Sequence, residues 1–165
     1  MPRTSAREDG FTLVELVITG ALMMVVLAAM LGIFSGLQRS AVRQASRSET
    51  ADQVRLTMDR MIKEIRQSTA INAASTASYL DMETFIGGTP ANVVYDATTP
   101  GILKRTEDGV TLIVLERLTV NALWTYSPDA ANPSTITVTL TAKPEKFLAD
   151  IAEVSLASEV ERRNR

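Results

Sequence analysis

The chain has 165 residues, which is close to the size of one domain with an added segment. It carries 17 Lys and Arg residues against 19 Asp and Glu residues, so its bulk charge does not indicate a nucleic-acid-binding protein. It has no Cys and no His, which excludes disulfides, the common zinc sites, and nucleophilic catalysis by Ser-His or Cys-His pairs.

Residues 11–34 read FTLVELVITGALMMVVLAAMLGIF and contain a single ionisable group, Glu15. As an α-helix this run is about 36 Å long, enough to cross a hydrocarbon core of about 30 Å. A cleaved secretory signal is disfavoured because its apolar region is shorter and Ala28-Ala29-Met30 is a poor cleavage site. A buried core helix is disfavoured because a run that is apolar on all sides would need a larger protein around it. The sequence therefore predicts a transmembrane helix over residues 11–34.

Glu15 is the chemically informative residue of this helix. A carboxylate deep in a membrane helix costs on the order of 2 to 3 kcal/mol, so it is usually retained for a partner, which should carry positive charge. The alternative is that Glu15 lies close enough to the start of the span to reach the membrane interface. Its position in the sequence leaves both interpretations open.

The start of the helix carries a specific motif. Gly10 is followed by FTLVELVI, which opens with Phe11 and has Glu15 at its fifth position; this resembles the signature of type IV prepilins. The resemblance implies that residues 1–10 are a leader, which a prepilin peptidase removes after Gly10 before it methylates the new amino terminus at Phe11. It also implies that Glu15 is an assembly residue, whose carboxylate pairs with the α-amino group of Phe11 on a neighbouring subunit. Because losing one partner of a buried ion pair is strongly destabilising, this pair would favour one docking register.

The resemblance also gives the orientation and the location. Basic residues flank both ends of the apolar run, so their distribution does not set the topology. The prepilin motif implies a cytoplasmic leader, one pass through the cytoplasmic (inner) membrane, and an extracytoplasmic remainder that later enters a pilus or pseudopilus. Gly20, Gly32 and Gly36 interrupt the helix, and two explanations stay open: local flexibility of the helix, or close packing of small residues against other helices.

A helical period continues after the apolar run and predicts a stem over residues 35–71. One face of this helix carries an apolar stripe that should pack on a globular head: Ala51, Val54, Met58, Met61 and Ile65. On the other side, Asp59 with Lys63 and Arg60 with Glu64 have the spacing of favourable i to i+4 ion pairs. Span and stem are expected to form one long helix.

Residues 72–165 are predicted to form a globular, β-rich head. A small polar loop ends the helix, and the period then changes to two. Strands are expected over residues 79–86, 92–97, 101–106, 110–120, 135–141 and 151–160, of which the last also has some helical character. The expected fold class is α+β, a pilin-like lollipop in which one long amino-terminal helix, transmembrane in its lower half, packs on a small antiparallel sheet.

The head also resembles, less specifically, the minor pseudopilin J of type II secretion and the related W-type minor pilins. The segments that carry this likeness are residues 58–68, 94–95, 103–105 and 161–164. The resemblance implies a structural subunit, a minor pilin or pseudopilin of a type IV pilus or a type II secretion pseudopilus. Its implied partners are other pilin or pseudopilin subunits, the prepilin peptidase, an inner-membrane platform protein, an assembly ATPase and membrane lipid.

The alternative is a membrane-anchored extracytoplasmic binding module, a receptor for DNA or a secreted substrate, that does not polymerise. We expect no nucleic acid, because Trp124 and Tyr126 do not lie among basic residues. No set of residues in the sequence has the arrangement of a known catalytic site, so we expect neither enzymatic activity nor a cofactor. We also expect no metal site; no EF-hand spacing occurs, although calcium on Asp or Glu oxygens stays open.

Overall fold

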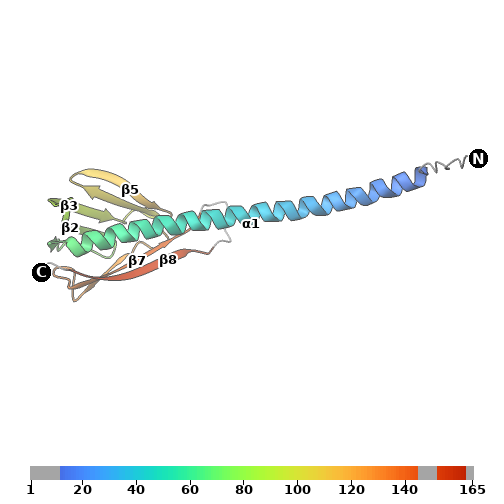
Figure 1. The fold of residues 1–165 in the computed structure, drawn as a ribbon. Helices are drawn as coiled ribbons and strands as arrows, with labels where there is room; N and C mark the ends of the chain where they lie inside the picture. Colours follow the sequence, from blue (N-terminus) through green and yellow to red (C-terminus); the bar gives the residue numbers. More distant parts are fainter. Residues whose placement is uncertain (1–11, 145–151, 163–165) are drawn as a thin grey trace, which may run out of the picture. The chain divides into compact units, whose positions relative to one another are not determined.

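The computed structural model describes residues 12–144 and 152–162, and it consists of one long helix followed by short antiparallel strands (Figure 1). Helix α1 covers Leu13–Gln67. The strands are β1 (Ala70–Ile71), β2 (Tyr79–Ile86), β3 (Thr89–Asp96), β4 (Ile102–Glu107), β5 (Val110–Glu116), β6 (Trp124–Ser127), β7 (Thr135–Ala142) and β8 (Val154–Glu161). The α+β fold class expected from the sequence is confirmed, with one long amino-terminal helix and antiparallel sheets.

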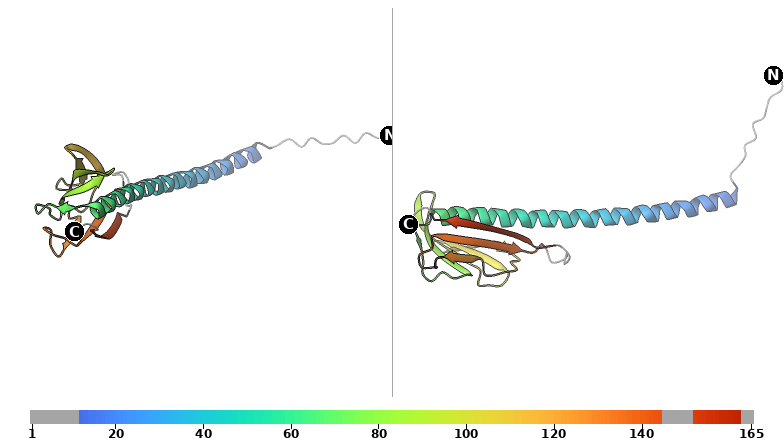
Figure 2. Two further views of the ribbon diagram at one scale, coloured as in Figure 1. Left: turned by 60° about the vertical axis from the view of Figure 1, so that its left-hand side comes forward. Right: turned by 90° about the horizontal axis from the view of Figure 1, so that it is seen from below.

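The chain divides into two units, residues 1–42 and residues 43–165, and the carboxyl-terminal part of α1 belongs to the second unit. In that unit the strands form a five-stranded sheet, in the order β1-β2-β3-β4-β5, and a three-stranded sheet, in the order β6-β7-β8. Every pairing is antiparallel. Figure 2 shows both sheets lying alongside the same carboxyl-terminal stretch of α1.

Two tight turns set the register of the larger sheet. Gly87 and Gly88, both with positive φ, join β2 to β3, so that Ile86 pairs with Thr89. In the same way Asp108 (φ 45°) and Gly109 (φ 87°) join β4 to β5. Positive φ at both central residues is the geometry of the two-residue turn that matches the twist of a hairpin, and Asp-Gly and Gly-Gly are its favoured sequences.

The core of the C-terminal unit forms where α1 packs against the sheets. Val54, Met58, Met61 and Ile65 are buried and Ala51 is half-buried, so the apolar stripe predicted for the stem is confirmed. The other fully buried large side chains come from the sheets and from Leu123, which precedes β6; those from the sheets are Trp124, Tyr95, Leu80, Met82, Leu103, Ile136, Leu140 and Val93. One helical face therefore covers an apolar surface drawn from both sheets.

The end of the helix differs from the expectation. The predicted stem reached residue 71, but α1 ends at Gln67, and the next residues turn into β1. The Ser68 side chain closes the last turn by donating to the Ile65 carbonyl at 2.7 Å. Ala70 and Ile71 then pair with Glu83 and Met82 of β2. The prediction was wrong there because pairing with a distant strand satisfies these backbone groups, and sequence periodicity does not reveal it.

Most predicted strands are found, with shifted ends. The strands over 79–86 and 135–141 are confirmed, as is the strand character of 154–160; residue 151 lies outside the described residues. The strand predicted over 110–120 stops at Glu116, because Arg117 adopts a positive φ of 62°, which lies outside the β region. Strands β1 and β6 were not predicted, since each is too short to show a period.

We expect Met61→Ala to lower the free energy of unfolding by about 2 to 5 kcal/mol, because it leaves a cavity where a fully buried side chain stood. Leu56→Ala is the matched control on the same helix, since Leu56 is 70% exposed, and its effect should stay within about 0.5 kcal/mol. Urea unfolding followed by the fluorescence of the single, buried Trp124 measures both. Equal effects of the two substitutions would contradict the packing described above.

Candidate functional site

The amino-terminal end of α1 places Glu15 in the first helical turn. Thr12 precedes the helix, and its side-chain oxygen accepts a hydrogen bond of 3.3 Å from the Glu15 backbone N–H. This is one half of a capping box, in which Thr and Glu stand three residues apart at a helix start. A carboxylate in the first turn is also favoured by the helix dipole. The sequence held this signal in the spacing of Thr12 and Glu15, and the prediction missed it.

Gly10 and Phe11, the predicted processing residues, lie outside the described residues. Gly20, Gly32 and Gly36 lie within α1, which is continuous through all three. A Cβ added at any of them would meet no atom within 4 Å, so the space around each glycine is open. The described part of the chain therefore gives these glycines no packing partner.

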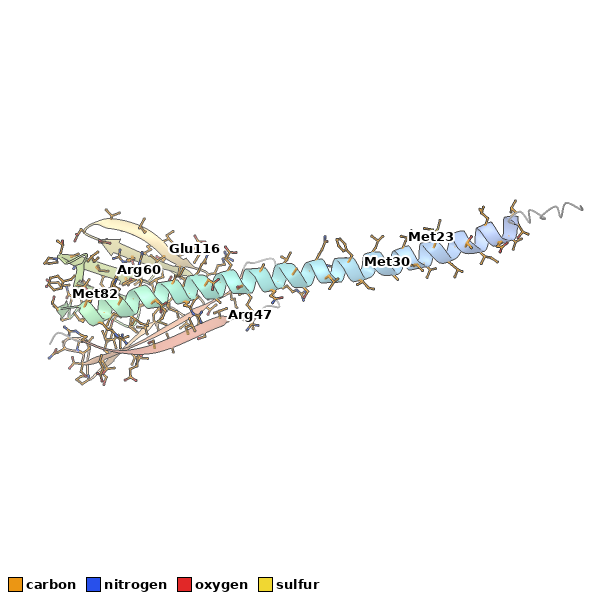
Figure 3. The ribbon with its side chains drawn as sticks, viewed as in Figure 1. Met23, Met30, Arg47, Arg60, Met82 and Glu116 are labelled. Carbon is orange, nitrogen blue, oxygen red and sulfur yellow. The ribbon has the colours of Figure 1, made fainter. Side chains whose placement is uncertain are left out.

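The rest of this part of α1 is an exposed apolar surface. Among the described residues α1 is the one helix long and apolar enough to cross a membrane, and none of its most apolar window is buried. Figure 3 shows side chains projecting around this helix, with Met23 and Met30 labelled; these two are 66% and 61% exposed. So large an apolar surface requires a covering of lipid or of other helices.

A second candidate site lies in the C-terminal unit, around the buried carboxylate of Glu64. The Arg105 guanidinium of β4 donates to both Glu64 oxygens, at 2.8 Å from Nη2 and 3.3 Å from Nε. The hydroxyl of Tyr95 on β3 donates to Glu64 Oε2 at 2.7 Å. Arg105 also donates to Glu107 at 2.6 Å, and its guanidinium carbon lies 6.0 Å from the centroid of the Tyr95 ring. These contacts join α1 to two strands of the larger sheet.

The electrostatics of this cluster favour an ionised Arg105 and a protonated Tyr95. Burial, reinforced by the charge of Glu64, raises the pKa of the Tyr95 hydroxyl well above its ordinary value. Burial disfavours the charged form of Arg105, but the hydrogen bonds to Glu64 and Glu107 and the charge of Glu64 outweigh it, and the arginine pKa is raised. Arg105 therefore stays cationic throughout the accessible pH range, as a permanent partner for Glu64.

The position of Glu64 corrects an expectation from the sequence. The predicted ion pairs Arg60–Glu64 and Asp59–Lys63 are not formed, and only three salt bridges occur among the described residues: Arg105–Glu64, Arg105–Glu107 and Lys143–Glu153. Glu64 instead belongs to the buried face, on which Thr57, Met61 and Ser68 also lie at helical spacing. That spacing was visible in the sequence. The sequence did not show that Arg105 would lie beside Glu64 and make the burial of its carboxylate energetically acceptable.

An open hollow of about 870 Å³ lies next to the Glu64 cluster. Its walls come from the end of α1, from the turn between β2 and β3, and from β4 and β5. Four basic residues line it (Arg60, Lys63, Arg66 and Arg105) against two carboxylates, those of Glu64 and Glu107. Because both carboxylates already accept hydrogen bonds from Arg105, the hollow presents a surplus of positive charge.

Comparison with known proteins does not assign the chain to a family. No protein-family model matches it, and no curated protein or solved structure is significantly similar to it. A function is therefore inferred from the residues of this chain and from their arrangement.

We expect Glu64→Gln to lower the free energy of unfolding by about 3 to 5 kcal/mol, because it leaves Arg105 buried without its main counter-charge. Glu107→Gln is the control: it removes a carboxylate from the same arginine, but one whose side chain is 38% exposed, and should cost about 0 to 1 kcal/mol. The double variant Glu64→Leu with Arg105→Met should recover much of the loss, because it removes both charges. Denaturant unfolding of the three variants tests this, and a Glu64→Gln variant as stable as Glu107→Gln would refute it.

Proposed function

We propose that this chain is a structural subunit, a minor pilin or pseudopilin, of a type IV pilus or a type II secretion pseudopilus. The observation that carries the proposal is Glu15, which lies in the first turn of α1 and is the one charged residue of that helix before Arg39. It is supported by the sequence motif around Gly10 and by the packing of the same helix, further along, against antiparallel sheets. An anchor alone would need the apolar length but not the carboxylate.

The proposed mechanism begins with processing. A prepilin peptidase cuts after Gly10 on the cytoplasmic face, and the new α-amino group at Phe11 is methylated and carries a positive charge. In the filament this cation pairs with Glu15 of a neighbouring subunit. An ion pair enclosed by apolar helices is favourable only when both partners are present, so it selects one register between subunits.

Assembly would also account for the exposed helix. In the membrane lipid covers its apolar surface, and in the filament the helices of neighbouring subunits would cover it instead. The three open glycine positions would then provide close helix contacts or local flexibility. An inner-membrane platform protein and an assembly ATPase would move the subunit from the membrane into the filament, with its strands on the extracytoplasmic side.

We expect Glu15→Ala to leave membrane insertion unchanged and to block incorporation into filaments. Removing one partner of an enclosed ion pair costs about 3 to 5 kcal/mol, which is more than a hundredfold in the association constant. The measurement is the amount of the chain in sheared filaments against the membrane fraction, in cells that carry the assembly machinery. Glu49→Ala, an exposed carboxylate further along α1, is the matched control and should assemble normally. Normal assembly of the Glu15 variant would favour a non-polymerising anchored module.

We further expect the mature chain to begin at Phe11 with a methylated α-amino group. Intact-mass measurement of the protein from its native membrane should show the loss of residues 1–10 and the added methyl group. Substituting Gly10 by a larger residue should leave the leader attached, because the prepilin peptidase cuts after a Gly. A native protein that still carries Met1 would refute the processing step.

A further inference from the structure

Strand β5 leaves part of its backbone edge uncovered. It is the last strand of the larger sheet, so one of its sides has no strand partner among residues 12–144 and 152–162. Residues 110–113 are all exposed, with Val110, Leu112 and Ile113 at 65%, 56% and 54%. Edge strands are usually protected by charges, proline or a covering element, and residues 110–113, Val-Thr-Leu-Ile, contain neither charge nor proline. This edge is therefore available for pairing with another extended chain.

The uncovered stretch has a defined limit. The side chain of Thr57 on α1 donates a hydrogen bond of 3.1 Å to the Val114 carbonyl, so the helix covers the edge from that point. Before it, Glu107 pairs with Val110 across the two-residue turn, and pairing continues through Thr106 with Thr111. Because hydrogen-bonded and non-bonded pairs alternate in an antiparallel ladder, Thr111 points its N–H and C=O away from β4. Ile113, two residues later, also points its backbone N–H and C=O away from β4.

A groove runs between this edge and α1. We call it the α1–β5 groove; α1 contributes Gln53, Leu56, Thr57, Arg60 and Lys63 to its lining, β5 contributes residues 112–114, and β3 contributes Tyr95. It comprises a hollow of about 570 Å³ beside Thr57 and the adjacent hollow of about 870 Å³ beside Glu64. Arg60, labelled in Figure 3, and Leu112 line both hollows and so mark their junction. An extended segment in this groove would have β5 on one side and α1 on the other.

The side chains of the groove are apolar and basic. Leu56 and Leu112 are 70% and 56% exposed and offer apolar contacts. The side chains of Arg60 and Lys63, and that of Arg66 in the hollow beside Glu64, make no hydrogen bond or ion pair with other described residues, so these three cations are free to meet a ligand. The nearby carboxylates of Glu64 and Glu107 are engaged by Arg105. The groove therefore favours a segment that combines acidic with apolar side chains.

We propose that the α1–β5 groove binds an extended segment of another protein, which adds a strand to β5 and places acidic side chains against Arg60 and Lys63. Main-chain hydrogen bonds to Thr111 and Ile113 would supply affinity, and the charges and apolar contacts would supply selectivity. A second copy pairing through its own β5 is disfavoured, because the two sets of free cations would face each other. The proposal goes beyond the structural role above and does not depend on polymerisation.

The test uses the full chain in detergent micelles and two labelled peptides, one alternating Glu with Val and Ile, the other with Lys in place of every Glu. Fluorescence anisotropy should show the Glu peptide binding at least about tenfold more tightly, with an affinity that falls as salt is raised. The double variant Arg60→Glu with Lys63→Glu should reverse this preference. Arg43→Glu with Arg47→Glu, exposed on the same helix but outside the groove, is the matched control and should leave it unchanged.

The backbone contribution is tested at Thr111. Thr111→Pro removes an outward N–H, which an edge strand tolerates, whereas Thr111→Val keeps it; only the Pro variant should lose binding, by about tenfold. Hydrogen exchange should show that the Glu peptide protects residues 110–113. Equal binding of both peptides, or unchanged binding by the folded Thr111→Pro variant, would overturn the proposal. Self-association that Thr111→Pro abolishes and the Glu peptide displaces would overturn it in favour of a second copy as the occupant.

Discussion

The apolar face of α1 between Val54 and Ile65 is the contact on which the C-terminal unit depends. A sheet exposed on both faces is not stable alone, and each of the two sheets here needs a cover on its inner side. The helix supplies that cover to both at once, with Val54, Met61 and Ile65 fully buried. The carboxyl-terminal part of α1 is therefore an integral part of the core of the C-terminal unit.

The Glu64–Arg105–Tyr95 cluster adds specificity to this contact. Apolar packing alone would allow the helix to slide or rotate slightly against the strands, since many apolar arrangements bury similar areas. A buried carboxylate that must meet a guanidinium on β4 and a hydroxyl on β3 tolerates far fewer arrangements. The cluster thus restricts the position of α1 relative to β3 and β4, next to the α1–β5 groove.

The two glutamates near the ends of α1 lie in different surroundings. Glu15 lies in the first turn, where the helix dipole and the Thr12 cap suit a carboxylate, within a surface that otherwise suits only lipid or other helices. Glu64 lies near the other end, inside a folded core, and its counter-charge comes from the same chain. Under the proposed function, Glu15 differs in taking its counter-charge from a neighbouring subunit. Under that proposal, a carboxylate with no salt-bridge partner among the described residues would make assembly selective.

The residue pattern alone determined the apolar segment, the apolar stripe on α1, the α+β class and the longest strands, because these depend on local periods of 3.6 and 2 that neighbouring residues repeat. It also contained the Thr12–Glu15 spacing of the helix cap. What only the tertiary structure decided was the pairing of residues far apart in the chain. It moved Glu64 from an expected surface pair with Arg60 into a buried pair with Arg105, and it turned residues 70–71 from helix into strand. It also left the edge of β5 open beside three free cations. The physical reason is that a buried charge and a strand edge are satisfied by partners whose distance in sequence carries no periodic signal.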